Sequence, residues 1–152
     1  MRLSFGKLRR ETEKKTVLFV CVENAGRSQI AEAFFRKYAV RDYLAISAGT
    51  RPAGEINPMA IQVMKEVGID MSKQKSKVIT EDMIMNATVI VNMGCIDKES
   101  CPILFIHNLI EWGIEDPKGK SIDKVREIRD DIEQRVKQLP ASLVKSSPQI
   151  KH

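Results

Sequence analysis

The sequence alternates short apolar runs with amphipathic stretches, and this alternation restricts the chain to few folds. The runs TVLFVC (16–21) and ATVIVNM (87–93) are continuously apolar and rich in β-branched residues, which is typical of strands buried in a parallel sheet. Further strands are expected at 43–47 and, as short pieces, near 103–106 and 108–112. The chain therefore has the strands for one parallel sheet.

Helical patterns separate these strands. The expected helices are 28–39, 57–67, 79–86 and 121–139. Asn57 before Pro58 is a typical helix start, Thr80 is a typical N-cap, and Pro140 follows the last helix. Strands that alternate with helices predict an α/β fold, a three-layer αβα arrangement with helices on both faces of the sheet.

The charge of the chain lies mostly in its ends. The net charge is +5, of which residues 1–15 carry +4 and residues 139–152 carry +2, so the segment between them carries −1. Nucleic-acid binding requires basic residues clustered on the folded surface, so we expect no nucleic-acid partner. We predict a basic extension (1–14), a single catalytic domain (15–139) and a flexible tail (140–152).

The sequence also indicates where the protein works. No apolar run reaches the roughly 18 residues of a membrane span, and the N-terminus lacks the apolar core of a signal peptide. The cysteines are Cys21, Cys95 and Cys101, and such a small, odd number argues against a structural disulfide framework. We expect a cytoplasmic monomer without a membrane partner.

Two of these cysteines follow predicted strands. Cys21 ends the run 16–21, and Cys95 comes just after the run 87–93. Ligands of parallel sheets bind beyond the carboxyl ends of the strands, and these ends meet at one edge. We therefore expect Cys21 and Cys95 at the same edge, although 74 positions separate them.

The stretch CVENAGRS (21–28) joins the first strand to the first helix. Backbone N–H groups of such a loop can converge on an anion, and the Arg27 guanidinium can bind a phosphate-like oxyanion in a bidentate manner. The same positive surroundings would lower the pKa of the Cys21 thiol and make it a nucleophile. Ser28 can hydrogen-bond the sulfur, Asn24 can fix the loop, and Gly26 permits an unusual φ angle and a close approach of the ligand.

The same residues have a simpler interpretation, a buried cysteine after a strand with a surface arginine nearby. Glu23 also fits poorly into an anion-binding loop, because its carboxylate would repel the ligand. We expect that its side chain points outward and that only its N–H faces the anion.

Several spaced motifs resemble one family. VLFVCVENAGRSQIAEAFF, ISAGT, NPMAIQVMKEVGID, the two later cysteines and EWGIEDPKGK are similar to the thioredoxin-coupled arsenate reductases, which have the low-molecular-weight protein tyrosine phosphatase fold. The resemblance covers residues 16–139. It implies a four-stranded parallel sheet, a nucleophilic Cys21 and a general acid at Asp116. It also implies an oxyanion-binding loop formed by Val22, Glu23, Asn24, Ala25, Gly26 and Arg27.

The resemblance also implies a reaction. Cys21 attacks arsenate, Arg27 holds its oxygens, and Asp116 protonates the departing oxygen. Cys95 then attacks Cys21 and arsenite leaves. Cys101 next attacks Cys95, and thioredoxin reduces the Cys95–Cys101 disulfide. The segment GCIDKESCP that holds these two thiols is polar, so we expect an exposed, mobile loop.

Two other functions remain open. A phosphatase of this fold would hydrolyse phosphotyrosine or aryl phosphates through a phosphocysteine, and a non-catalytic module would only bind an oxyanion. The Asp116-Pro117 pair is also a common turn. Phosphotyrosine phosphatases of this fold usually have tyrosines after Asp-Pro and a second cysteine in the loop, whereas this chain has Lys118-Gly119 and Gly26. Both departures favour the reductase.

Some relatives of this family bind potassium behind the loop. Asn24, Glu32 and Ser47 match three of the residues at that site, whereas Lys77 stands where an aspartate would be expected. We predict that the Lys77 ammonium occupies the cation site or repels a cation from it, so that potassium is not needed and these four residues support the loop without a metal. We expect no cofactor.

Overall fold

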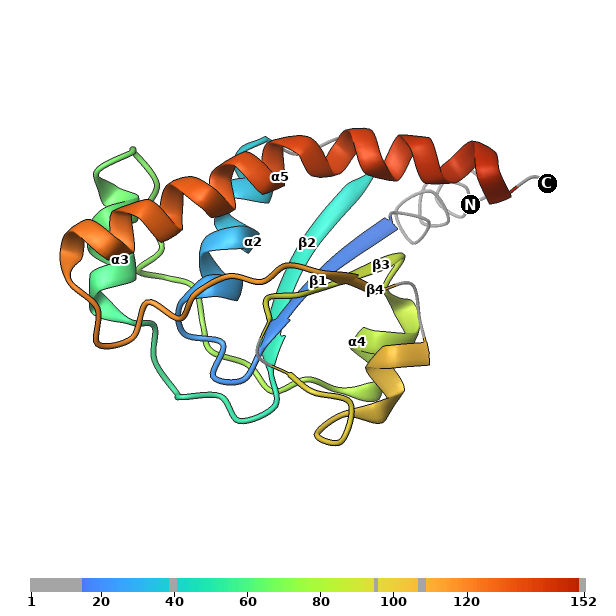
Figure 1. Cartoon of the computed structure of the whole chain (residues 1–152), viewed down its shortest axis with the longest axis horizontal. Helices are drawn as coiled ribbons and strands as arrows, with labels where there is room; N and C mark the ends of the chain where they lie inside the picture. Colours follow the sequence, from blue (N-terminus) through green and yellow to red (C-terminus); the bar gives the residue numbers. More distant parts are fainter. Residues whose placement is uncertain (1–14, 39–40, 95, 107–108, 151–152) are drawn as a thin grey trace, which may run out of the picture.

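A four-stranded parallel sheet forms the centre of the protein in the computed structural model (Figure 1). The structure describes residues 15–38, 41–94, 96–106 and 109–150. The strands are β1 (Lys15–Cys21), β2 (Tyr43–Gly49), β3 (Val89–Asn92) and β4 (Leu109–Glu111), arranged in the order β2-β1-β3-β4. β1 is thus central, and Cys21 at its carboxyl end pairs in register with Gly49.

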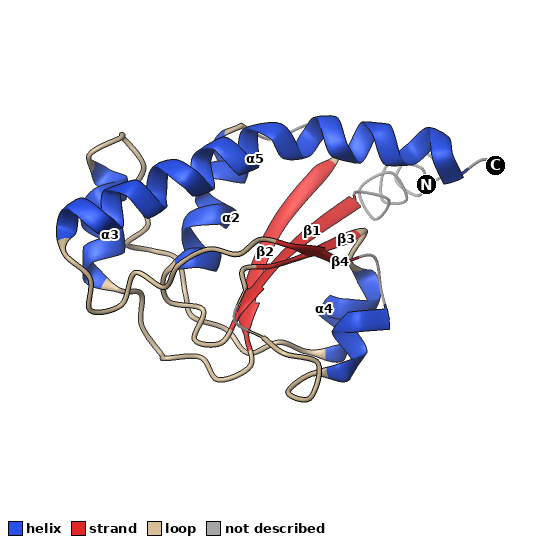
Figure 2. Ribbon diagram, viewed as in Figure 1, coloured by secondary structure: helices blue, strands red, loops and turns tan. Residues whose placement is uncertain are grey.

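Helices cover both faces of the sheet (Figure 2). One face carries α2 (Arg27–Lys37), α3 (Pro58–Lys65) and α5 (Ile122–Ile150), and the other carries α4 (Glu81–Asn86) and the 3₁₀ helix η1 (Pro102–Ile106). The predicted three-layer arrangement with a four-stranded parallel sheet is confirmed.

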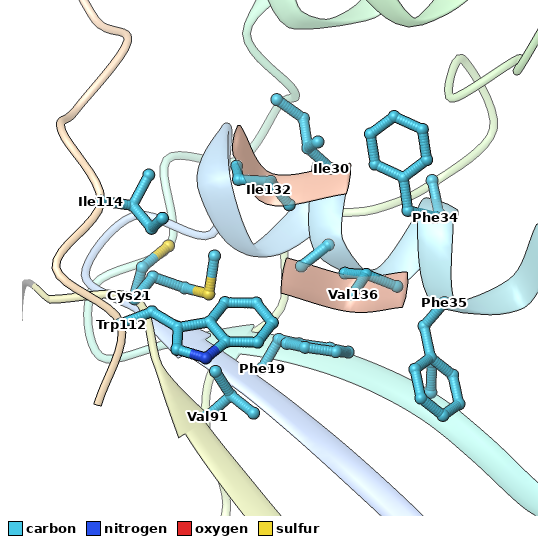
Figure 3. Packing of buried hydrophobic residues seen from close by; sticks show 14 of the residues in the cluster. Phe19, Cys21, Ile30, Phe34, Phe35, Val91, Trp112, Ile114, Ile132 and Val136 are labelled. Atoms are coloured by element: carbon cyan, nitrogen blue, oxygen red, sulfur yellow. The ribbon is translucent and has the colours of Figure 1, made fainter. Parts of the chain in front are cut away.

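The alternation of side chains along β1 builds two separate cores. Val17, Phe19 and Cys21 point to the face under α2 and α5, whereas Leu18 and Val20 point to the face under α4 and η1. Figure 3 shows Cys21 with Phe19 and the Trp112 indole in the first core. The nucleophile candidate therefore starts from a rigid, apolar base.

The predicted helix starts are confirmed. The Asn57 side chain accepts a hydrogen bond from the Met59 N–H with Pro58 in the first turn, and the Thr80 hydroxyl accepts one from Met83. These caps satisfy backbone donors that have no partner inside the helix. They fix the segments that approach the carboxyl edge of the sheet.

Two predicted boundaries are wrong. Residues 103–106 form part of η1 and not a strand, because Pro102 cannot donate within a sheet and a short apolar run fits either structure. The last helix continues past Leu139 to Ile150, so residues 140–150, predicted as a tail, are helical. Pro140 removes one hydrogen bond at a cost of about 3 kcal/mol, but it does not force the chain out of the helix.

Two predictions cannot be compared with the structure. The extension 1–14 and Cys95 lie outside the described residues. Within the described part of the chain, none of the helices combines the length and the apolar character required to span a membrane.

Candidate active site

A pocket of about 510 Å³ lies beyond the carboxyl end of β1. Its walls come from three segments, residues 21–27, 53–58 and 116–119, so Cys21, Arg27 and Asp116 share one cavity. We refer to residues 21–28, which form the base of the pocket, as the oxyanion loop.

The oxyanion loop turns its carbonyl groups away from the pocket. Four of them accept hydrogen bonds from the segment after β2, and two accept from α2. The donors, in the order of carbonyls 21 to 26, are the N–H groups of Thr50, Arg51 and Ala53, the Gln29 side chain, and the N–H groups of Asn57 and Ile30. Because the N–H of a trans peptide points opposite to its C=O, the loop presents N–H edges to the pocket, where an oxyanion would bind.

Gly49 makes this arrangement possible. A Cβ at this position would lie 2.5 Å from the Val22 carbonyl oxygen and 2.9 Å from that of Cys21. Any other residue would push β2 and the oxyanion loop apart. Neither Gly49 nor the segment 50–57 was among the residues predicted for the site, although a glycine at the end of a buried strand is a signal of such a close approach.

The Cys21 sulfur is buried and receives polar contacts. The Ser28 Oγ lies 2.9 Å from the sulfur, and the Asn24 N–H donates to it at 3.2 Å. The Asn24 amide donates in turn to the Ser28 Oγ at 2.7 Å, which leaves the hydroxyl hydrogen available for the sulfur. Donors directed at sulfur stabilise a thiolate over a thiol.

Asn24 holds the loop in its shape. Its Oδ1 accepts hydrogen bonds from the Gln29 side chain and from the Lys77 N–H, both at 2.8 Å, and its φ angle is 50°. The unusual φ expected at Gly26 is therefore found at Asn24, a residue type that tolerates the left-handed region. Gly26 instead has a φ of −131°, and a Cβ there would lie 3.0 Å from the Pro117 ring, so its role is close packing.

Arg27 connects the oxyanion loop to the loop that carries Asp116. Its Nη1 donates to the Ile114 carbonyl at 2.9 Å, and its Nη2 lies 3.6 Å from the Asp116 carboxylate. The Asp116 side chain is 56% exposed and lines the pocket, whereas Glu115 turns away to pair with Lys120 and Lys124. Asp116, and not its neighbour, is thus the carboxyl group that lines the pocket.

Comparison with known proteins agrees with this geometry. The profile of the family described as low molecular weight phosphotyrosine protein phosphatase matches residues 16–149. The chain belongs to this family. An arsenate reductase of Brevibacillus brevis is 42% identical over 125 residues, which cover 82% of this chain and 92% of that protein.

Solved structures show the same fold in members of this family. A structure described as an arsenate reductase in the phosphate binding state has a TM-score of 0.75 and 33% identity, and covers 84% of this chain and 98% of its own. A thioredoxin-dependent arsenate reductase of Corynebacterium glutamicum has a TM-score of 0.72 and 31% identity, and the match covers 95% of this chain and 73% of that one. The resemblance of the motifs to arsenate reductases is confirmed.

The residues predicted to lie behind the oxyanion loop include a group of charged side chains. The Glu32 carboxylate is buried, accepts a hydrogen bond from Ser47 at 2.5 Å and pairs with Arg36. The Lys77 ammonium lies 3.8 Å from Glu32 and donates to the Lys75 carbonyl. Burial lowers the pKa of Lys77, although Glu32 acts in the opposite direction. The Lys77 ammonium therefore lies beside Glu32, and the statement that potassium is not needed stays a prediction.

Among the residues that the structure describes, no three His, Cys, Asp or Glu side chains form a group that could hold a metal ion.

Glu23 lies at the rim of the pocket. Its carboxylate is 3.2 Å from the Lys118 ammonium, and its side chain is 44% exposed. Its backbone carbonyl accepts hydrogen bonds from Ala53 and from the Ser76 hydroxyl. The outward orientation expected for this side chain therefore agrees with the structure, and Lys118 compensates its charge.

The segment before Cys101 is exposed at residues 97–100, as expected, but Ile96 at its start is buried. Cys101 is half-buried and packs against the core under α4, where Leu104 is fully buried. An Asp97 carboxylate that accepts from the Ser100 N–H at 2.8 Å forms the turn before it. The apolar residues after Cys101 draw the segment onto the sheet, which the polar residues before it concealed.

Cys95 lies outside the described residues, but the residues on either side of it are anchored. Both Gly94 and Ile96 donate backbone N–H groups to the Asn92 side chain, which donates to the Ile96 carbonyl at 2.8 Å. Asn92 ends β3, the strand next to β1. Gly94 and Ile96 are thus held next to the carboxyl end of β3.

Proposed function

We propose that the protein is an arsenate reductase that uses Cys21 as its nucleophile and Cys95 and Cys101 as a thiol relay. The observation that carries this proposal is the pocket, which joins an anion-binding loop, a buried thiol and an exposed carboxyl group. Relatives with the name arsenate reductase, such as the one from Brevibacillus brevis, support the choice of substrate.

The first step forms a covalent adduct. The Cys21 thiolate attacks arsenic(V), Arg27 binds the arsenate oxygens, and Asp116 gives its proton to the departing oxygen, which leaves as water. The loop N–H groups compensate the charge on the remaining oxygens.

The second step transfers two electrons. The Cys95 sulfur attacks the Cys21 sulfur, the electron pair of the S–As bond goes to arsenic, and arsenite leaves with arsenic(III). Two thiols have then become one Cys21–Cys95 disulfide, so the electrons balance. Attack of Cys101 on Cys95 moves the disulfide to Cys95–Cys101 and restores the Cys21 thiol.

A protein dithiol must then reduce the second disulfide. Thioredoxin is the proposed reductant, supported by the thioredoxin-dependent reductase of Corynebacterium glutamicum. We also propose that the protein acts as a monomer in the cytoplasm, where thiols are kept reduced.

Hydrolysis of phosphate esters is the second candidate. The family description and the Cys21–Arg27–Asp116 set both support it. However, among the described residues no aromatic side chain lines the pocket, and an aryl group would gain most of its binding energy from such a surface. A small oxyanion needs no such wall, so arsenate fits this pocket better than phosphotyrosine.

A panel of cysteine variants separates these functions. Cys21→Ser should abolish both arsenate reduction and hydrolysis of p-nitrophenyl phosphate. Cys95→Ser and Cys101→Ser should abolish multiple-turnover reduction with thioredoxin yet retain hydrolysis. If these two variants reduce arsenate at the parental rate, the relay through Cys95 and Cys101 is wrong, whereas hydrolysis by the parental protein without any arsenate reduction would make it a phosphatase. Phosphate binding without either activity would leave only an oxyanion-binding module.

A further inference from the structure

The loop that carries Asp116 has few attachments to the rest of the protein. It connects β4 to α5 without regular structure, and Trp112 and Ile114 anchor its first part in the core. From Glu115 to Lys120 the loop is exposed apart from Pro117. The position of Asp116 over the pocket therefore depends on a small number of contacts.

Three contacts join this exposed part to the oxyanion loop. Arg27 lies 3.6 Å from the Asp116 carboxylate, Pro117 packs over Gly26, and Lys118 pairs with Glu23 at 3.2 Å. The Lys118 N–H also donates to the Asp116 Oδ1 at 3.0 Å. Lys118 thus holds the acid through its backbone and the oxyanion loop through its side chain.

The Arg27–Asp116 contact weakens when the enzyme is ready to react. A general acid must carry its proton, and a neutral Asp116 no longer attracts the guanidinium by charge. A bound oxyanion also competes for the Arg27 donors. The ion pair between Glu23 and Lys118 has neither weakness, because neither group binds the reacting atoms.

We propose that the Glu23–Lys118 ion pair is a clasp that positions Asp116 over the oxyanion loop in the substrate complex. This proposal rests on the proposed role of Asp116 as general acid. It also gives the acidic residue in an anion-binding loop a function, since Lys118 compensates its charge at the pocket mouth. Glu23 and Lys118 are positioning residues, and Asp116 remains the catalytic one.

Charge reversal tests the clasp. Glu23→Lys, Lys118→Glu and the double variant are reduced, mixed with excess arsenate without external reductant, and followed for one turnover of arsenite. Since exposed ion pairs contribute up to about 1 kcal/mol, each single reversal should lower the maximal rate constant by about fivefold. The double variant restores the pair with opposite polarity and should return to within about twofold of the parental rate.

The concentration of arsenate at half-saturation provides a second readout. Glu23→Lys adds positive charge at the mouth and should lower this concentration, whereas Lys118→Glu should raise it. A purely electrostatic effect on binding would move this concentration in opposite directions and leave the maximal rate constant unchanged. That result, or a double variant slower than both single variants, overturns the clasp.

A matched ion pair provides the control. Asp131 and Arg135 on α5 are exposed and lie 2.9 Å apart, and neither lines the pocket. Asp131→Lys and Arg135→Glu should leave both the maximal rate constant and the half-saturating concentration at parental values.

Hydrolysis of aryl phosphates keeps the two proposals apart. If the parental protein forms no arsenite, the proposed reductase fails, but the clasp is still tested because Asp116 would protonate the leaving phenol. Phenoxide is a poorer leaving group than p-nitrophenoxide, so its departure depends more on protonation by the general acid. Both single reversals should therefore slow the hydrolysis of phenyl phosphate more than that of p-nitrophenyl phosphate. Equal losses on the two esters overturn the clasp.

Discussion

The oxyanion loop and the segment around Cys101 both carry a thiol, but they are held in different ways. In the oxyanion loop, the buried side chains of Asn24, Ser28 and Gln29 bond to the backbone and to one another. Among the described side chains of the segment 96–106, the buried anchors are Ile96, whose backbone is bonded by the Asn92 side chain, and Leu104, and the exposed residues between them are held by one side-chain turn at Asp97.

This difference matches the two tasks in the proposed reaction. A nucleophile must meet a bound oxyanion at a fixed distance, so a network of buried hydrogen bonds is useful there. A thiol that passes a disulfide outward must change partners, and a weakly held segment opens at low cost. The rigid oxyanion loop and the more easily opened segment around Cys101 are thus separate parts of the protein.

The largest effect is expected from the centre of the rigid region. Asn24→Ala removes the acceptor for Gln29 and Lys77, leaves buried donors without partners and puts alanine at a φ of 50°. The free energy of unfolding should fall by about 3 kcal/mol, measured by urea denaturation with circular dichroism. Since a displacement of the reacting groups by about 1 Å costs roughly 10²-fold in rate, the rate of arsenate reduction should fall by that factor.

An exposed asparagine serves as its control. Asn86→Ala at the end of α4 should change the free energy of unfolding by less than about 0.5 kcal/mol, with activity unchanged. Parental activity in Asn24→Ala would show that the network does not position the nucleophile.

A smaller effect is expected where the rigid loop meets the Asp116 loop. Gly26→Ala brings a Cβ to 3.0 Å from the buried Pro117 ring, and this proline, which lies in an otherwise exposed loop, must move away by a few tenths of an ångström. The free energy of unfolding should barely change, whereas the single-turnover rate should fall by about threefold to tenfold through displacement of Asp116. Gly113→Ala is the matched control, because a Cβ at this position meets no atom within 4 Å. Its free energy of unfolding and its single-turnover rate should equal the parental values.

The smallest effect is expected in the weakly held segment. Asp97→Ala removes the side-chain hydrogen bond of the turn before Cys101, so in a Cys21→Ser/Cys95→Ser background a thiol reagent should label Cys101 about two- to fivefold faster. Glu99→Ala keeps the turn and should label at the parental rate. Equal labelling of all three proteins would mean that Asp97 does not hold this segment closed.

The pH dependence of this labelling follows from the same carboxylate. Hydrogen bonds from the Ser100 side chain and N–H lower the pKa of Asp97 in the folded protein. The stability that ionised Asp97 gives to the folded segment is therefore fully present above the ordinary aspartate pKa of about 3.9. It is lost as the pH falls through the lower pKa that Asp97 has in the folded protein. The difference between Asp97→Ala and the parental segment should disappear over that acidic range.

Much of the site could be predicted because it depends on periodic patterns and on neighbours in sequence. The apolar run of β1, the loop after it and the caps at Asn57 and Thr80 are local signals. The contacts between distant segments could not be read in this way. Gly26 shows this, since its requirement comes from Pro117, and the φ angle expected there occurs at Asn24.

Competing signals explain the remaining errors. The apolar residues after Pro102 fit a strand or a 3₁₀ helix equally well, and only packing on the second core decides between them. Pro140 is a strong stop signal in a sequence, yet helix formers on both sides allow α5 to continue.

The position of Trp112 gives the protein a built-in optical signal. It is the one tryptophan in the sequence, its indole is buried, and it shares a core cluster with Cys21, with Phe19 at a centroid distance of 6.0 Å (Figure 3). Indole emission responds to charge and quenching groups within a few ångströms. In the proposed reaction, each change at the Cys21 sulfur, from thiolate to adduct to disulfide, would therefore occur in the same core cluster as this natural fluorophore, so stopped-flow mixing should time it without any label.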